Sequence, residues 1–291
     1  CLILLLMLSF IGMLIGIFNI RENIKELLLI LKCSFILLAL FSFLAIFYGE
    51  QFYVFRGNGQ DHFAYLTSGL MFSNFSFQEL LTMNNTEYTS KITNDVYLHN
   101  SLYIMKYRPS VQLMLGLLMK LEFLDPMKIG FIFKSMVSVL ILLSSITFFK
   151  TFTFNERLSL FFSYGFVLSF FNFYNYEIDA YSLILSLPFL FLILKYSSNL
   201  IKNTIEFNNF FYFKYIFIWA CYFIIYPNGA SIVMLPVFVY ILLSLFKYKI
   251  DLFKIIKLFL FSFLFLILIL PTFDTTIMYL YESEIPSGLK H

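Results

Sequence analysis

The chain has 291 residues, of which 60% are hydrophobic, 21% are aromatic and only 13% are charged. A soluble domain carries roughly 25% charged residues, so water has little to solvate on much of this chain. The net charge of +3 is too small, and the basic residues are too scattered, to predict a nucleic-acid partner. Cys1, Cys33 and Cys221 lie in apolar stretches without zinc-ligand spacing, which predicts small packed side chains.

Several apolar stretches are candidate membrane spans, because about 20 helical residues cross a hydrocarbon core of about 30 Å. They are 1–20, 27–48, 129–149, 158–175, 181–197, 214–227, 229–246 and 258–271. These stretches predict an all-α, polytopic bundle that forms a single transmembrane domain over 1–291. The chain begins with Cys and ends in SEIPSGLKH, so we expect that sequence is missing at one or both ends.

A further apolar run at 110–124 is short for a span and contains Lys120 and Glu122, so we expect it to lie along the membrane surface. With that assignment the cytoplasmic side receives all the short basic loops, as the positive-inside rule favours. These loops are 21–26, 150–157, 198–213 and 247–257. The outer side then receives the long loop 49–128, which is predicted to carry amphipathic helices, and the acidic residues of the later turns.

The loop 49–128 begins with a predicted short helix. Asn58-Gly59 is a turn signal, and Phe63, Leu66 and Leu70 then recur at helical spacing. We expect the apolar face formed by these three residues to rest on the bilayer.

Asp61 lies at the start of this predicted helix and allows two interpretations. It can cap the helix, a position that favours Asp. It can also be a carboxylate held at the membrane surface to act on a substrate hydroxyl or amine, which the neighbouring Arg56, His62 and Tyr65 favour. An Asp-His pair alone is weak evidence for a metal site, so no metal ligand is predicted and a divalent cation is left open.

Two basic residues precede the surface helix, for which Pro109 is a suitable first residue. Lys106 and Arg108 lie on the outer side, against the general charge bias. They are either long side chains that extend to the membrane interface or ligands for a lipid phosphate or pyrophosphate. Arg offers a planar fork for the second role.

Glu177 and Asp179 lie at the junction between two predicted spans. Carboxylates so close to a bilayer are costly to bury unless they are solvated or take part in a functional site. A solvated turn and a functional site both satisfy this condition.

These motifs, in their order along the chain, resemble the GT-C superfamily of glycosyltransferases, membrane enzymes that use polyprenyl-phosphate-linked sugars. Asp61-His62-Phe63-Ala64-Tyr65 is similar to the D-E/H-x-x-Y pattern of the family's outer loop. RPSVQLMLGLLMKLEFLDPMKIGFIFKSM is similar to its Pro-led surface helix, with Lys128 or Lys134 in the basic position that opens the next span. YNYEIDAYSLILSLPFLF puts Asp179, or else Glu177, where the family has a second acidic residue.

The resemblance implies an integral membrane glycosyltransferase that moves a sugar from a polyprenyl-phosphate donor to a glycan, lipid or protein acceptor. Asp61 would be the general base or would orient the acceptor, and Asp179 or Glu177 would support the acceptor or a bound cation. Three basic residues would bind the donor phosphate: Lys106, Arg108 and Arg56. His62 and Tyr65 would support the site. The implied location is a bacterial inner membrane, with the site facing the periplasm.

The resemblance covers roughly residues 27–275 and has three departures. The span 1–20 is extra, His62 replaces the commoner acidic residue, and the family's C-terminal part is missing or cut short. The substitution at His62 argues against a two-carboxylate metal site. Two rival functions remain open. One is a non-catalytic transporter or flippase of lipid-linked glycans, which usually has charged residues near the middle of its spans; Lys32 is the main candidate here. The other is a glycan polymerase or ligase of another fold.

Overall fold

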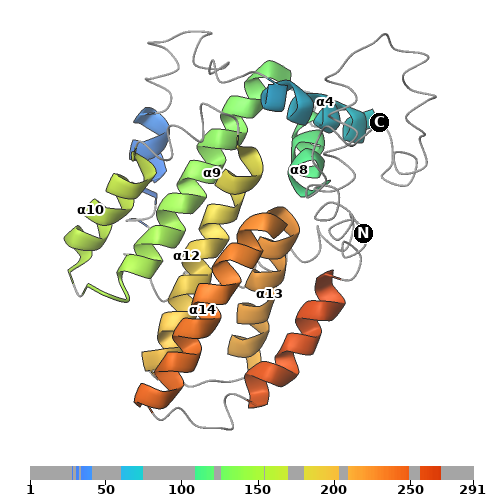
Figure 1. The fold of residues 1–291 in the computed structure, drawn as a ribbon. Helices are drawn as coiled ribbons and strands as arrows, with labels where there is room; N and C mark the ends of the chain where they lie inside the picture. Colours follow the sequence, from blue (N-terminus) through green and yellow to red (C-terminus); the bar gives the residue numbers. More distant parts are fainter. Residues whose placement is uncertain are drawn as a thin grey trace, which may run out of the picture. The chain divides into compact units, whose positions relative to one another are not determined.

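The computed structural model describes residues 28, 31–32, 34–40, 60–74, 109–120, 126–153, 155–169, 180–202, 209–248 and 256–269. Regular structure in these residues is helical throughout, and they contain no strand. The chain divides into two units, 1–47 and 48–291. The described residues of the first unit are helical, and the second unit holds all the labelled helices of Figure 1. The predicted span 1–20 lies outside the described residues.

The helices of the second unit agree with most of the apolar stretches. They are α4 (Gln60–Asn74), α8 (Pro109–Lys120), α9 (Pro126–Phe149), α10 (Glu156–Val167), α12 (Tyr181–Lys202), α13 (Asn209–Ile225), α14 (Pro227–Tyr248) and a helix at Ile256–Ile269. Ile132–Phe149 of α9 and Tyr181–Leu200 of α12 are long and apolar enough to cross a membrane. Helices are therefore confirmed in the predicted stretches 129–149, 181–197 and 229–246, in 214–225 of 214–227, and in the described residues of 258–271. Two of them have the length and polarity of a span.

Helices α9 and α12 pack side by side and run in the same direction (Figure 1). Near their first residues, the rings of Phe133 and Tyr181 meet edge to face with centroids 5.3 Å apart. Further along, the rings of Phe148 and Phe191 lie 5.6 Å apart. We call the two ends of this pair the Tyr181 end and the Lys150 end, after the residue at the start of α12 and the residue that follows α9.

Helix α13 returns antiparallel to α12. Its first turns meet the last turns of α12, where the hydroxyls of Ser197 and Tyr215 share a hydrogen bond of 2.8 Å. The Tyr196 ring lies 5.2 Å from the Phe211 ring at the same level. The start of α13 therefore lies at the Lys150 end, and its last residue lies toward the Tyr181 end.

Buried serines allow these helices to pack closely. Ser138 and Ser163 each donate a hydrogen bond of 2.7 Å to the carbonyl four residues earlier, and Ser197 does the same at 2.8 Å. Small side chains bring backbones together, and each of these hydroxyls has a hydrogen-bond acceptor within its own helix. The Ser197 hydroxyl also shares a hydrogen bond with Tyr215 of α13. This packing suits an environment with no water to solvate a polar group.

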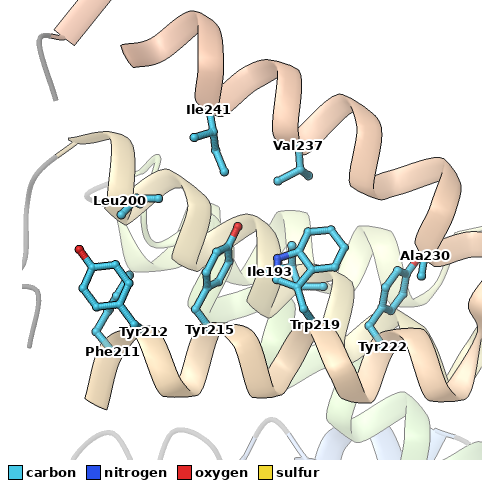
Figure 2. Close-up of a cluster of buried hydrophobic side chains, with 10 residues drawn as sticks. All are labelled: Ile193, Leu200, Phe211, Tyr212, Tyr215, Trp219, Tyr222, Ala230, Val237 and Ile241. Atoms are coloured by element: carbon cyan, nitrogen blue, oxygen red, sulfur yellow. The ribbon is translucent and has the colours of Figure 1, made fainter. Parts of the chain in front are cut away.

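An aromatic cluster joins α12, α13 and α14. Figure 2 shows side chains on one side of α13 that point between the other two helices, with Trp219 near the middle. Aromatic pairs with offset or edge-to-face geometry stabilise such a core beyond the area they bury. The buried members are Ile193, Leu200, Phe211, Tyr212, Tyr215, Trp219, Tyr222, Ala230, Val237 and Ile241.

One non-helical residue, Tyr226, separates α13 from α14, and Pro227 is the first residue of α14. Pro is favourable at this position because the missing N–H has no partner in a first helical turn. A side chain at position 229 would overlap the ring of Tyr226, which explains the glycine there.

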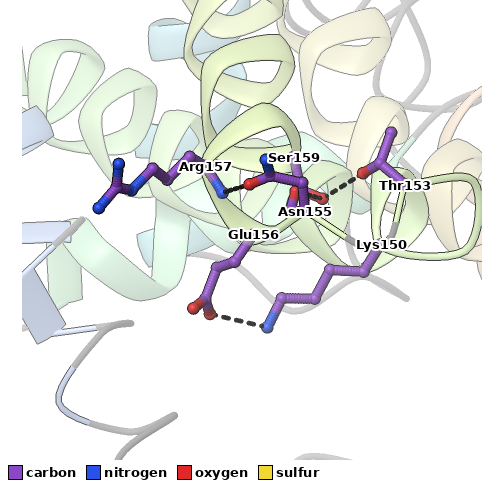
Figure 3. Close-up of polar contacts among 6 residues, drawn as sticks. All are labelled: Lys150, Thr153, Asn155, Glu156, Arg157 and Ser159. Atoms are coloured by element: carbon purple, nitrogen blue, oxygen red, sulfur yellow. Dashed lines mark hydrogen bonds and ion pairs between the residues drawn. The ribbon is translucent and has the colours of Figure 1, made fainter.

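Polar contacts close the turn between α9 and α10 (Figure 3). The Asn155 side chain accepts a hydrogen bond of 2.9 Å from the backbone N–H of Arg157 and caps α10. The hydroxyls of Thr153 and Ser159 share a hydrogen bond of 2.7 Å across the turn. These contacts satisfy groups at the exposed start of a helix.

Helix α10 is shorter than the predicted span 158–175. It has 12 residues and ends at Val167, where Leu168 is no longer helical. A helix of this length covers about 18 Å, which is too short to cross a bilayer by itself. Gly165 lies in its last turn, where glycine lowers helix propensity. A prediction based on hydrophobicity does not include this free-energy cost. The predicted span 158–175 is therefore wrong at residues 168–169, which are not helical. Residues 170–175 lie outside the described residues.

Candidate functional site

Helices α4 and α8 approach each other closely at a pair of glycines. A Cβ atom on Gly116 would lie 2.8 Å from the carbonyl oxygen of Gly69 and 2.8 Å from the Cβ atom of Phe72. Two glycines at the crossing therefore let the backbones touch. Pro109 is the first residue of α8, so the predicted Pro-led helix is confirmed.

One side of α4 is buried within the protein. Tyr65, Ser68 and Phe72 recur at helical spacing and are buried, whereas Leu70 is 47% exposed. The prediction that Phe63, Leu66 and Leu70 rest on the bilayer is wrong for Leu66, which is buried within the protein. Leu70 is exposed, as the prediction requires, and the Phe63 side chain lies outside the described residues. The reason is tertiary: the covered side of α4 is the one that carries Gly69, where α8 can approach.

Tyr65 links α4 to the first turn of α12. Its hydroxyl shares a hydrogen bond of 3.0 Å with the hydroxyl of Ser182. Its ring meets the ring of Tyr181 edge to face, with centroids 5.2 Å apart. These contacts join residues 117 positions apart in the sequence. Helix α4, whose first turns contain the D-H-x-x-Y motif, is thereby held at the Tyr181 end of the bundle.

Lys134 lies beneath the same ring. Its ammonium nitrogen is 5.4 Å from the centroid of the Tyr181 ring, and the residue is only 3% exposed. An ammonium over an aromatic face is attracted to the ring quadrupole. We call Tyr65, Phe133, Lys134, Tyr181 and Ser182 the tyrosine–lysine cluster. It brings the buried amine of Lys134 and three hydroxyls to the place where α4, α9 and α12 meet.

The predicted site residues fall into three groups. Tyr65 belongs to the tyrosine–lysine cluster. Asp61 and His62 lie in the first turn of α4, one turn before Tyr65, and their side chains lie outside the described residues. The remaining predicted residues lie wholly outside the described residues and are Arg56, Lys106, Arg108, Glu177 and Asp179.

The sequence pattern predicts no role for Tyr181 or Ser182. Lys134 is predicted only as one candidate for the basic residue at the start of a span. The signal for Lys134 was present, since an ionisable residue inside an apolar span is a functional candidate by default. Tyr181 and Ser182 carried no such signal. Their importance depends on α4 folding back onto α12, which pattern alone does not reveal.

Within the described ranges, no three His, Cys, Asp or Glu side chains come together as metal ligands. The acidic side chains on which a cation site would depend, those of Asp61, Glu177 and Asp179, lie outside these ranges. Comparison of the chain with protein-family models, with curated proteins and with solved structures finds no match. Function is therefore inferred from the chemistry of this chain alone.

Proposed function

We propose that the chain is a multi-pass membrane glycosyltransferase of the GT-C type. It would transfer a sugar from a polyprenyl-phosphate donor to an acceptor hydroxyl or amine at the outer membrane face. The observation that carries the proposal is the contact of Tyr65 with Tyr181 and Ser182. It joins the helix that bears the Asp61 motif to the helix that follows the acidic segment 177–179.

Chain connectivity supports a meeting of the two acidic segments. Asp61 precedes Tyr65 by four residues in the same helix, or about 6 Å along its axis. Asp179 precedes Tyr181 by two residues, and consecutive Cα atoms are about 3.8 Å apart. Since Tyr65 and Tyr181 touch, both carboxylates belong to stretches within reach of one small substrate group.

Charge distribution supports an outer location for this site. The Lys150 end carries exposed cations, among them Arg157 and Lys214, and an ion pair of 3.3 Å between Lys150 and Glu156. Membrane proteins retain such basic segments in the cytoplasm. The tyrosine–lysine cluster lies at the opposite end of α9 and α12, which agrees with an outer site.

The proposed step breaks the bond between the anomeric carbon of the sugar and the phosphate oxygen. The acceptor oxygen or nitrogen forms a new bond to that carbon, and its proton passes to the Asp61 carboxylate. Polyprenyl phosphate leaves with the bonding electrons, and Lys106 and Arg108 would stabilise its charge. A positioned base contributes roughly 10²–10⁴-fold to such a rate, and fixed cations stabilise the charge that develops.

Asp61→Asn is expected to lower sugar transfer by roughly 10²-fold or more, because the amide cannot accept the acceptor proton. The measurement is transfer of radiolabelled sugar from polyprenyl-phosphate donors in membranes that contain the full-length protein. Glu156→Gln is the matched control, since it removes an exposed carboxylate at the Lys150 end. Near-normal turnover by an Asp61→Asn protein at equal membrane yield contradicts the assignment.

Arg108→Ala is expected to weaken binding of the donor more than binding of the acceptor, because only the donor carries a phosphate. The apparent KM for each substrate gives the comparison. Arg157→Ala, which removes an exposed cation next to the cap of α10, serves as the control. Equal losses for the two substrates would remove the phosphate role from Arg108.

A further inference from the structure

A cavity of about 130 Å³ lies between α13, α14 and the helix at Ile256–Ile269. Tyr215 and Trp219 line its inner wall and are buried. Met234 and Phe238 of α14 line another wall and are 44% and 56% exposed, so the cavity opens to the outside of the bundle. Apolar cavities of about this size exclude water and take hydrocarbon. This cavity therefore suits an apolar chain.

A cation lies at the end of the cavity that faces the Lys150 end of the bundle. Lys257 directly precedes Leu258, which lines the cavity, and its ammonium donates a hydrogen bond of 3.4 Å to the side chain of Asn209. Asn209 is the first residue of α13, and Trp219 lies ten residues further, about 15 Å along the helix. The ammonium of Lys257 therefore lies at the end of the helices, and the cavity extends from there toward their middle.

Charge complementarity selects the kind of molecule that fits. A cation at the mouth of an apolar cavity matches an amphiphile with an anionic head, and basic pockets between membrane helices on the cytoplasmic side bind anionic lipids. The polyprenyl-phosphate donor is the poorer match. Its phosphate would lie with the tyrosine–lysine cluster, which is at the opposite end of α9 and α12 from Lys257.

We propose that this cavity binds one acyl chain of an anionic phospholipid of the cytoplasmic leaflet, with the lipid phosphate at Lys257. The chain supplies the dispersion contacts that the cavity wall lacks on its open side, and it joins α14 to the helix at Ile256–Ile269. The inference rests on the membrane placement in the proposed function, but it does not depend on sugar transfer.

Fluorescence of Trp219 tests the proposal, because Trp219 is the only tryptophan of the chain and lines the cavity. The full chain is reconstituted into phosphatidylcholine vesicles that contain increasing fractions of phosphatidylglycerol with brominated acyl chains, which quench tryptophan on contact. Half-maximal quenching is expected at an about 5-fold lower fraction than with brominated phosphatidylcholine, the usual effect of one lysine at an anionic surface. Equal quenching by the two lipids overturns the proposal.

Two charge variants test the position of the lipid phosphate. Lys257→Gln is expected to abolish the preference for phosphatidylglycerol. Arg157→Gln removes an exposed cation at the same end of the bundle and should keep the preference. A preference that survives Lys257→Gln, or that Arg157→Gln removes equally, comes from the general surface charge and overturns the site.

Ser262→Leu tests the cavity itself. The Ser262 hydroxyl lines the cavity and donates a hydrogen bond of 2.9 Å to the carbonyl of Leu258 in the same helix, so its removal exposes no new donor. The larger side chain is expected to exclude the acyl chain and to reduce quenching by both lipids. Leu266→Phe enlarges an exposed residue outside the cavity lining and should leave quenching unchanged. If Ser262→Leu is not recovered, Met234→Phe fills the mouth instead, and unchanged quenching overturns the proposal.

Competition separates the possible occupants. Unbrominated phosphatidylglycerol should relieve the quenching, whereas stronger relief by polyprenyl phosphate assigns the cavity to the donor and overturns the proposal. If neither brominated lipid quenches Trp219 in a chain that floats with the vesicles, a protein segment fills the cavity, and the proposal is again overturned.

The outcomes also separate this inference from the proposed function. A lipid preference without any transferase activity keeps the lipid site and removes the proposed reaction. Loss of sugar transfer in Asp61→Asn without a lipid preference keeps the reaction and removes the lipid site. A chain that does not float with the vesicles removes the membrane placement on which both depend.

Discussion

Gly116 has no room for a side chain, because a Cβ atom there would meet Gly69 and Phe72 at 2.8 Å. Gly116→Ala is expected to force α4 and α8 apart and to destabilise the fold by about 1–3 kcal/mol, the usual cost of overpacking. Thermal unfolding in detergent measures the loss.

Gly165→Ala is the matched control for this substitution. Gly165 lies in a helix, and a Cβ atom at this position would have no neighbouring atom within 4 Å. Alanine there should be neutral or should stabilise α10 by about 0.5–1 kcal/mol through helix propensity. If both alanine variants behave alike, the crossing of α4 and α8 does not require glycine.

The individual site residues were predictable to different degrees. Asp61 and Tyr65 were found because their spacing forms a motif, and Tyr65 has a defined contact in the structure. The burial of Lys134 was not predicted, because it depends on a ring contributed by α12. A sequence identifies a charged residue, whereas tertiary packing decides which side chains contact it.

The start of α10 depends on one side chain. Asn155→Ala removes the acceptor for the Arg157 N–H and is expected to cost about 0.5–2 kcal/mol, as is usual for the loss of an N-cap. The unfolding temperature of the full chain measures this cost. Asn155→Asp retains an acceptor and should keep most of the stability, so equal losses for alanine and aspartate would show that capping is not the cause.

Helices were easier to predict than their ends and faces. Long apolar runs gave α9, α12, α13 and α14 within a few residues of their observed bounds. The end of α10 was missed because an apolar run continues past Val167 while the helix does not. The side of α4 that is buried within the protein was not predicted, because it depends on the glycines that admit α8.

The arrangement of the bundle predicts which ends are accessible from each side of the membrane. In a background without the three native cysteines, Leu117→Cys on α8 and Phe152→Cys at the Lys150 end both present exposed positions. An impermeant maleimide added to intact cells should label position 117. Position 152 should react only after the cytoplasm is opened, because the basic segments remain there.

Labelling of position 117 only from the cytoplasm would contradict the outer location of α8. Labelling of both positions from outside would contradict the assignment of the Lys150 end. Either result would also move the tyrosine–lysine cluster to the wrong side for a donor with an outward-facing sugar.

The order of hairpins was predictable from the alternation of apolar runs and basic loops. The parallel course of α9 and α12 and the antiparallel return of α13 agree with that alternation. The contact between α4 and α12 was not predictable, because a long polar loop places no limit on which helix it meets. The aromatic and hydroxyl contacts of Tyr65 define that meeting.

In the proposed multi-pass membrane protein, the single residue between α13 and α14 has a consequence for biogenesis. During synthesis, a linker this short cannot pass through an insertion channel as a separate loop after α13 has settled in the lipid. The two helices would have to partition from the translocon together, as one preformed pair, with Trp219 and its neighbours already in contact. Lengthening that linker would then change the timing of insertion more than the final packing.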